Sequence, residues 1–237
     1  RQCKIPDAEM IWFDLDQTLL DHLSASRADL VALKQMDERW SGVSEERWVD
    51  TYREINGRLW KESLRTASLS METVRVERFR LLLESLGLPA DDTDWVPDTY
   101  LDLYVDRCAC YVGAREVVER LYTDGRRIGI ITDGARDIQL RKIAHCQLDA
   151  FIETMVTPDD AGAYKPERAI FEYAADVAKL PACANVCVGD SWEHDIEGAI
   201  DAGWSAVWLS DHSDVPTKEK PPDVHIIRRL EELEELL

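Results

Sequence analysis

Short apolar runs that alternate with helical segments place the strongest constraint on the fold of this chain. Runs typical of buried strands lie near residues 10–15, 127–132, 152–157, 185–190, 204–209 and 223–227. Helical periodicity separates the later runs, near residues 114–123, 136–145, 167–179 and 192–202. Strands that alternate with helices predict a parallel sheet covered on both faces, so we expect a doubly wound, Rossmann-like α/β core.

A long insert separates the first two predicted strands and is too long for one crossover connection. It shows no strand pattern, and apolar residues recur at helical spacing near residues 48–59, 76–86 and 100–104. We therefore expect a discontinuous Rossmann-like core and an inserted four-helix domain. The expected boundaries are residues 1–21 and 112–237 for the core and residues 22–111 for the helical domain.

Two carboxylates directly follow the first predicted strand, in the segment Asp14-Leu15-Asp16-Gln17-Thr18. Strand alternation would point Asp14 and Asp16 to opposite sides. A bend just after Asp14 would let both reach one pocket, where one carboxylate attacks and the other transfers protons. The structural alternative is that Asp16 only caps a turn.

Three further motifs occupy the ends of predicted strands or the start of a helix. They are Thr132-Asp133-Gly134, the pair Lys165-Pro166, and Asp190 with Asp195. Pro166 fits the first turn of a helix. Because ligands of open α/β sheets bind at the carboxyl ends of the strands, we expect these motifs to converge on one site. Taken singly, Lys165 fits a surface lysine and Asp195 a helix cap, and we expect His22 and His194 to be only neighbours of the site.

The four motifs, in this order, resemble those of the haloacid dehalogenase superfamily and, within it, the magnesium-dependent phosphatases. The resemblance covers nearly the whole chain and implies that the helical insert is a cap. True dehalogenases of this superfamily lack the acid two positions after the nucleophile, so Asp16 favours phosphoryl chemistry. Asp133 is a departure, because asparagine is common there, and a second negative charge near a phosphate is unfavourable unless the side chain points away.

The resemblance implies hydrolysis of a phosphate monoester through an aspartyl-phosphate. Asp14 would be the nucleophile, and Asp16 the general acid and then the general base. This role requires Asp16 to hold a proton, which we expect the neighbouring carboxylates to favour. The implied phosphate-binding residues are Thr132, Asp133, Gly134 and Lys165, with Lys165 balancing the negative charge. The implied Mg²⁺ ligands are Asp14, Asp190, Asp195 through water, and the backbone carbonyl of Asp16.

The expected substrate is a small phosphorylated metabolite. The Gln139-x-x-Lys142 pattern resembles the branch that contains nucleotidases and acylneuraminate phosphatases. A phosphoglycolate or sugar phosphatase is the alternative within this chemistry. A haloacid dehalogenase and a catalytically idle fold used for binding are alternatives from other classes.

Composition restricts which kinds of partner and which cellular compartment are expected for this chain. A formal net charge of −19 argues against nucleic acid as a partner. No stretch approaches the roughly 18 apolar residues of a membrane span, so no membrane partner is expected. Six cysteines without C-x-x-C spacing predict free thiols in a reducing cytoplasm. The sequence does not decide between a monomer and a homodimer.

Two groups of residues in the insert have structural explanations. Its tryptophans, Trp40, Trp48, Trp60 and Trp95, could stack on a substrate but are expected to form its core. Its arginines could bind a second anionic group, but a solvated helix face is expected to explain most of them. These are Arg53, Arg58, Arg65, Arg75 and Arg78.

Overall fold

The computed structural model describes residue 5 and residues 8–66, 70–210 and 221–236. The chain divides into two compact units. One unit joins the N-terminal residues up to His22 to the residues from Ala109 onward, and the other consists of Leu23–Cys108. The chain therefore leaves the first unit after its first strand and returns to it before its second strand.

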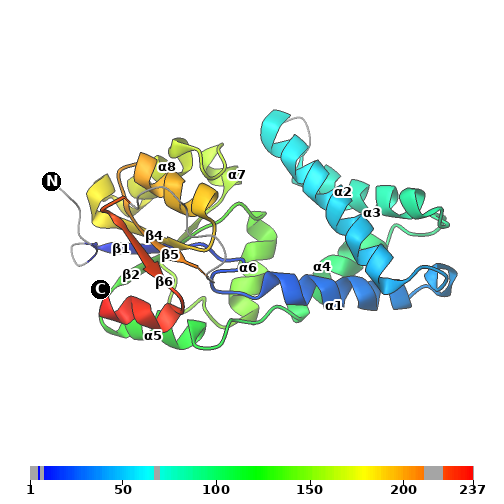
Figure 1. Cartoon of the computed structure of the whole chain (residues 1–237), viewed down its shortest axis with the longest axis horizontal. Helices are drawn as coiled ribbons and strands as arrows, with labels where there is room; N and C mark the ends of the chain where they lie inside the picture. Colours follow the sequence, from blue (N-terminus) through cyan, green and yellow to red (C-terminus); the bar gives the residue numbers. More distant parts are fainter. Residues whose placement is uncertain (1–4, 6–7, 67–69, 211–220, 237) are drawn as a thin grey trace. The chain divides into compact units, whose positions relative to one another are not determined.

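A six-stranded parallel sheet forms the centre of the first unit (Figure 1). Its spatial order is β3-β2-β1-β4-β5-β6, and all neighbouring strands are parallel. The order reverses between β1 and β4, where an open α/β sheet accepts ligands. The predicted doubly wound α/β fold is confirmed. The strands are β1 (Met10–Phe13), β2 (Arg127–Ile131), β3 (Thr154–Val156), β4 (Asn185–Gly189), β5 (Ser205–Leu209) and β6 (Val224–Ile227).

The central strand β1 supplies both cores of this unit because successive side chains point to opposite faces. Ile11 and Phe13 enter one buried apolar cluster, and Met10 and Trp12 enter the other. Figure 1 shows α5 and α8 on opposite faces of the sheet. The first cluster includes residues of α5 (Ala114–Thr123), α6 (Arg136–His145) and η5 (Leu230–Glu235). The second includes residues of α8 (Arg168–Ala178), η4 (Trp192–Glu197) and α9 (Gly198–Asp201).

Local structure differs from the expected helices at two points. The helix expected over 192–202 begins as the π-helical turn η4, in which the amides of Asp195 and Ile196 both donate to the carbonyl of Ser191, at 2.9 and 3.3 Å. Pro166 precedes α8 and does not occupy its first turn. Two further short elements, η3 (Ala182–Ala184) and α7 (Pro158–Ala161), complete this unit.

The second unit is helical and has an aromatic core. Trp40 and Trp48 are fully buried and stack with ring centroids 5.2 Å apart. Trp95 also stacks on Trp40, with ring centroids 5.9 Å apart. The expectation that these tryptophans form the core is confirmed for Trp40 and Trp48. In the described part of the chain, no helix combines the length and apolar character needed to cross a bilayer. The elements are α1 (His22–Gln35), η2 (Glu38–Trp40), α2 (Glu45–Thr66), α3 (Met71–Leu86) and α4 (Val96–Asp106).

Two residues of α3 lie on the face opposite to the expected one. Val76 was expected on a buried face but is 51% exposed, whereas Arg78 was expected on a solvated face but is only 8% exposed. The guanidinium carbon of Arg78 lies 5.0–5.7 Å from three aromatic ring centroids, which provides cation–π contacts. The three rings belong to Tyr52, Phe79 and Tyr100.

The described cysteines agree with the expectation of free thiols. Cys108 and Cys187 are buried, and no described cysteine forms a disulfide. Cys3 lies outside the described residues. Among the other described cysteines, Cys110, Cys146 and Cys183 likewise form no disulfide.

A buried carboxylate in α1 carries a charge that the helical unit stabilises poorly. Asp29 is fully buried, and neither of its oxygens has a hydrogen-bond partner among the described residues. Its ion-pair partner, Arg107, lies 3.6 Å away. Burial raises the pKa of Asp29 to about 6, although the charge of Arg107 opposes this shift. Ionised Asp29 is therefore expected to destabilise the folded unit.

We expect Asp29→Asn to increase the free energy of unfolding at pH 7.5. A carboxyl pKa that rises from 3.8 to about 6 on folding costs up to about 3 kcal/mol once the group is ionised in both states. The cost grows as pH rises from 4 to 6, so the gain at pH 5 should be roughly half of that at pH 7.5. Urea unfolding followed by tryptophan fluorescence measures both values. Asp50→Asn, at an exposed position of α2, is the control, and equal gains at both pH values would contradict the assignment.

Candidate active site at the carboxyl ends of the strands

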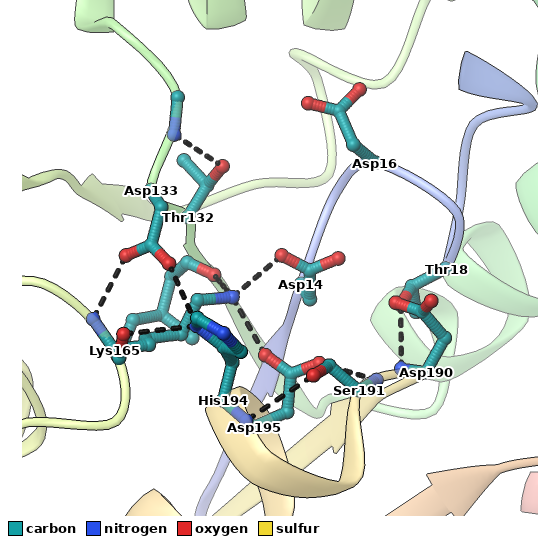
Figure 2. A network of polar contacts seen from close by, with 12 residues as sticks. Asp14, Asp16, Thr18, Thr132, Asp133, Lys165, Asp190, Ser191, His194 and Asp195 are labelled. Atoms are coloured by element: carbon teal, nitrogen blue, oxygen red, sulfur yellow. Dashed lines mark hydrogen bonds and ion pairs between the residues drawn. The ribbon is translucent and has the colours of Figure 1, made fainter. Parts of the chain in front are cut away.

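A buried lysine lies at the centre of a polar cluster beyond the ends of β1, β2 and β4 (Figure 2). Lys165 Nζ donates to Asp14 Oδ1 and to Asp195 Oδ1, each at 2.6 Å, and to the carbonyl of Ile131 at 3.3 Å. These contacts use all three donors of the ammonium group. The structure thus brings together three of the residues that the sequence singled out.

The electrostatics of this cluster favour an additional cation. Burial raises the pKa of Asp14 well above its usual range, and the charge of Asp195 adds to this effect while Lys165 opposes it. Burial alone would lower the pKa of Lys165, but Asp14 and Asp195 raise it well above its usual range. Burial and the nearby Asp195 raise the pKa of Asp190 to about 6. One ammonium group therefore faces three carboxylates in a largely desolvated site.

Local hydrogen bonds fix the three carboxylates near one another. Asp14, Asp190 and Asp195 each offer an oxygen, and these atoms all lie within 4.8 Å of one another. The amide of Asp14 donates to the carbonyl of Val188 at 2.9 Å, which ties the end of β1 to β4. The hydroxyl of Thr18 donates to Asp190 Oδ1 at 3.2 Å and accepts from the amide of Asp190 at 3.1 Å. Three carboxylate oxygens at this spacing can hold a hard divalent cation.

The last residue of β4 leaves room for one of these carboxylates. A Cβ atom at Gly189 would lie 2.3 Å from Asp195 Oδ2, so any side chain there would displace the carboxylate. Asp195 Oδ2 instead accepts from the amide of Ser191 at 3.0 Å. The glycine and the π-helical turn together place Asp195 over the end of β4.

Asp16 lies apart from the other carboxylates, and its environment differs from the expected one. Figure 2 shows its carboxylate turned away from Asp14. Its oxygens accept from Lys142 Nζ at 2.5 Å and from Gln139 Nε2 at 2.9 Å, and His22 Nδ1 lies 3.7 Å away. Burial opposes ionisation, but Lys142, His22 and Gln139 lower the pKa of Asp16 to about 2. The expectation that neighbouring carboxylates favour a protonated Asp16 is wrong for this arrangement.

The carboxylate of Asp133 is directed toward the backbone of the lysine segment. Its Oδ1 accepts from the amide of Lys165 at 2.9 Å, and its Oδ2 lies 3.6 Å from His194 Nδ1 (Figure 2). His194 Nδ1 also lies 3.0 Å from the carbonyl of Lys165. The nearby carboxylate of Asp133 raises the pKa of His194. Asp133 and His194 thus support the segment that carries Lys165, and the sequence indicated neither contact.

Thr132 lies at the end of β2 and accepts two hydrogen bonds. Its Oγ1 accepts from the amide of Gly134 at 3.2 Å and from Gln139 Nε2 at 2.7 Å. Gln139 and Lys142 were noted in the sequence only as a branch-specific pattern. Gln139 and Lys142 are three residues apart on the helix that follows Thr132, so they share one helix face. This spacing could have indicated that both side chains reach the site.

Comparison with known proteins identifies the family. The model of haloacid dehalogenase-like hydrolases matches residues 11–209. The chain belongs to this family. It is 26% identical to N-acylneuraminate-9-phosphatase of Rattus norvegicus over 96% of this chain and 92% of that protein. It is 27% identical to pyrimidine 5'-nucleotidase YjjG of Escherichia coli over 97% of each chain.

A solved structure shows the same fold. The HAD-hydrolase YfnB of Bacillus subtilis, described as putative and bound to magnesium, superimposes with a TM-score of 0.78. The match covers 97% of this chain and 98% of that chain at 24% sequence identity. At this identity the match supports the hydrolase fold alone.

We expect Gly189→Ala to reduce turnover of para-nitrophenyl phosphate by on the order of 100-fold, because a displacement of about 1 Å in a catalytic group has effects of this size. The added methyl group would displace Asp195 and weaken its contact with Lys165. Steady-state kinetics measure the loss of turnover, and urea unfolding measures whether the variant is less stable. Gly57→Ala is the matched control, because a Cβ there meets no atom within 4 Å. Unchanged turnover in Gly189→Ala would show that the position of Asp195 is unimportant.

Proposed function

We propose that this family member is a divalent-metal-dependent phosphatase that acts on a small phosphorylated metabolite. The observation that carries the proposal is the buried contact of Lys165 with Asp14 and Asp195, beside Asp190, at the point where the strand order reverses. The named relatives, a phosphatase and a nucleotidase that each align with nearly the whole chain, support the same reaction class.

The donor set fits Mg²⁺, which prefers oxygen ligands and carboxylates. We propose that Asp14, Asp190 and Asp195 hold it together with the backbone carbonyl of Asp16, with Asp195 acting through water. The raised pKa values of Asp14 and Asp190 support this assignment, since burial and the charge of Asp195 raise them, and a bound cation would offset both effects. When bound, the cation would offset the negative charge of the carboxylates and polarise a phosphoryl oxygen.

Asp14 is the proposed nucleophile. Its carboxylate attacks phosphorus, a bond from Asp14 to phosphorus forms, and the bond from phosphorus to the ester oxygen breaks. Lys165 holds Oδ1 of Asp14 and would also offset charge on the transferred phosphoryl group. Thr132 would donate its hydroxyl hydrogen to a phosphoryl oxygen, with the amides of Asp133 and Gly134 nearby. Water then attacks phosphorus and regenerates Asp14.

Asp16 is the proposed acid and base for the two steps. Its low pKa in this structure means that it is ionised at neutral pH. This form suits the second step, in which the carboxylate takes a proton from the attacking water. For the first step, Asp16 must bind a proton and then give it to the leaving oxygen. We propose that substrate binding changes the surroundings of Asp16 enough to allow this.

The proposed substrates are nucleotides or acylneuraminate phosphates, as the names of the relatives suggest. Specificity is proposed to reside in the helical unit, Leu23–Cys108. Phosphoglycolate or sugar phosphates are the alternative substrates, and a panel of these four classes separates the possibilities. Halide displacement is disfavoured because a haloacid reaction has no use for the acid at Asp16. An idle fold is disfavoured by the intact contacts of Lys165 with Asp14 and Asp195.

We expect Asp14→Asn to abolish hydrolysis of para-nitrophenyl phosphate while the protein stays folded, because the amide is a far weaker nucleophile than the carboxylate. Wild-type turnover should require Mg²⁺ and stop on addition of a chelator. Mass spectrometry of acid-quenched reactions should find one phosphoryl group, located on Asp14. Asp149→Asn, at an exposed position, should behave as wild type. Retained activity in Asp14→Asn, or chelator-resistant turnover, would contradict the mechanism.

A further inference from the structure

Two polar side chains on α6 are buried beside the proposed acid–base residue. Gln139 is 1% exposed and Lys142 is 2% exposed. Their spacing of three residues places them on one face of the helix. A lysine is almost never fully buried without a partner, and the structure provides Asp16, whose Oδ1 lies 2.5 Å from Lys142 Nζ. Both side chains therefore make specific polar contacts and do not merely fill space in the core.

The side-chain amide of Gln139 bridges two proposed catalytic groups. Its Nε2 lies 2.9 Å from Asp16 Oδ2 and 2.7 Å from Thr132 Oγ1. An NH₂ group has two hydrogens, so both contacts can be donated at once. The reversed orientation of the amide would set its carbonyl oxygen against an ionised carboxylate, which only accepts hydrogen bonds. The chemistry of Asp16 thus determines which way the amide points.

The hydrogen bond from Gln139 determines how the hydroxyl of Thr132 can interact with a ligand. A hydroxyl accepts at two lone pairs and donates one hydrogen. Thr132 Oγ1 accepts from Gln139 Nε2 and also from the amide of Gly134, at 3.2 Å. With both acceptor positions occupied, its hydrogen is directed toward a third group. An oxygen of a bound phosphoryl group is the acceptor that the proposed reaction supplies.

The absence of a side chain at Gly134 leaves space for the side-chain amide of Gln139. A Cβ atom at Gly134 would lie 2.3 Å from Gln139 Nε2, so alanine there would displace the amide. Both oxygens of Asp16 are engaged from α6, Oδ1 by Lys142 and Oδ2 by Gln139. The carboxylate of Asp16 is consequently anchored to α6 and not to the cluster around Lys165.

We infer that Gln139 and Lys142 are positioning residues of the active site. Lys142 holds the carboxylate of Asp16, and Gln139 both holds that carboxylate and directs the hydroxyl of Thr132 toward the phosphoryl group. This inference rests on the proposed phosphatase function and extends it to two residues that contact Asp16 and Thr132 but are not themselves among the proposed metal ligands or phosphate-binding residues. The mechanism so described predicts different kinetic effects for the two residues.

The test compares two esters that differ in their need for a general acid. An alkyl phosphate requires a proton on its leaving oxygen, whereas para-nitrophenyl phosphate releases a stable phenolate. The ratio kcat/KM reports the reaction up to loss of the leaving group. Since general acid catalysis contributes on the order of 100-fold or more, Lys142→Met should lower kcat/KM for the alkyl ester at least about 10-fold more than for the aryl ester.

Gln139→Met should produce a different pattern. Loss of the bridge frees the Thr132 hydroxyl to point elsewhere, so kcat/KM should fall for both esters, and further for the alkyl ester. Gly134→Ala should reproduce this pattern, because it displaces Gln139 without changing it. Lys142→Arg should retain much of the alkyl-ester activity that Lys142→Met loses. Leu140→Ala, at an exposed position of the same helix, is the control and should leave both esters unaffected.

A double-variant cycle keeps the test independent of folding defects. Lys142→Met alone leaves Asp16 without its main cation, but Lys142→Met combined with Asp16→Asn removes both charges. If Lys142 acts through Asp16, adding Lys142→Met to Asp16→Asn should cause no further leaving-group-dependent loss. Additive losses, or equal losses for both esters, would overturn the inference. Absence of wild-type turnover would instead reject the proposed function, so the two failures are distinguishable.

Discussion

The ammonium group of Lys165, buried between Asp14 and Asp195, determines how the rest of this site can be arranged. Each carboxylate comes from a different part of the chain, and none can be moved into a buried position without a positive partner. Removing one partner of a buried ion pair leaves an uncompensated charge, which costs about 3–5 kcal/mol. The cluster is still short of positive charge beside Asp190, and this shortage is the physical basis for assigning a metal ion to it.

The sheet explains why these groups meet. With β1 between β2 and β4, the residues that follow three adjacent parallel strands share one edge. The hydrogen bond from the amide of Asp14 to Val188 extends the pairing of β1 and β4 into the site. Gly189 then leaves space for Asp195, and the π-helical turn places it. Secondary structure thus positions the backbone, while small residues decide which side chains fit.

Residue type and position at a strand end were enough to predict the core of the site. Asp14, Lys165 and Asp195 follow apolar runs or precede a helix, and their convergence follows from the parallel sheet. The alternating pattern likewise predicted the doubly wound fold. Contacts that depend on side-chain reach were not predictable in this way. The carboxylate of Asp16 turns to Lys142, and that of Asp133 turns to the backbone of Lys165, because each finds a donor there.

Burial of isolated charges was the other feature that periodicity could not indicate. Arg78 and Asp29 occupy helix faces whose sequence suggests nothing unusual. Only tertiary packing places aromatic rings around Arg78 and leaves the side chain of Asp29 without a hydrogen bond from any described residue. The π-helical turn at Asp195 is similar, since a shared carbonyl at Ser191 creates it. The surroundings of Arg78 and Asp29 are provided by residues of other helices, Tyr52 and Tyr100 for Arg78 and the residue that follows α4, Arg107, for Asp29.

Isothermal titration calorimetry of Mg²⁺ binding tests whether Asp14, Asp190 and Asp195 form a metal site, and it needs no substrate. We expect one site in the wild-type protein and at least about tenfold weaker binding in Asp190→Asn, since a site with few carboxylate ligands depends on each of them. Asp149→Asn, a change of the same kind at an exposed position, should bind as the wild type does. Unchanged affinity in Asp190→Asn, or no binding to the wild-type protein, would contradict the claim that these carboxylates form a metal site.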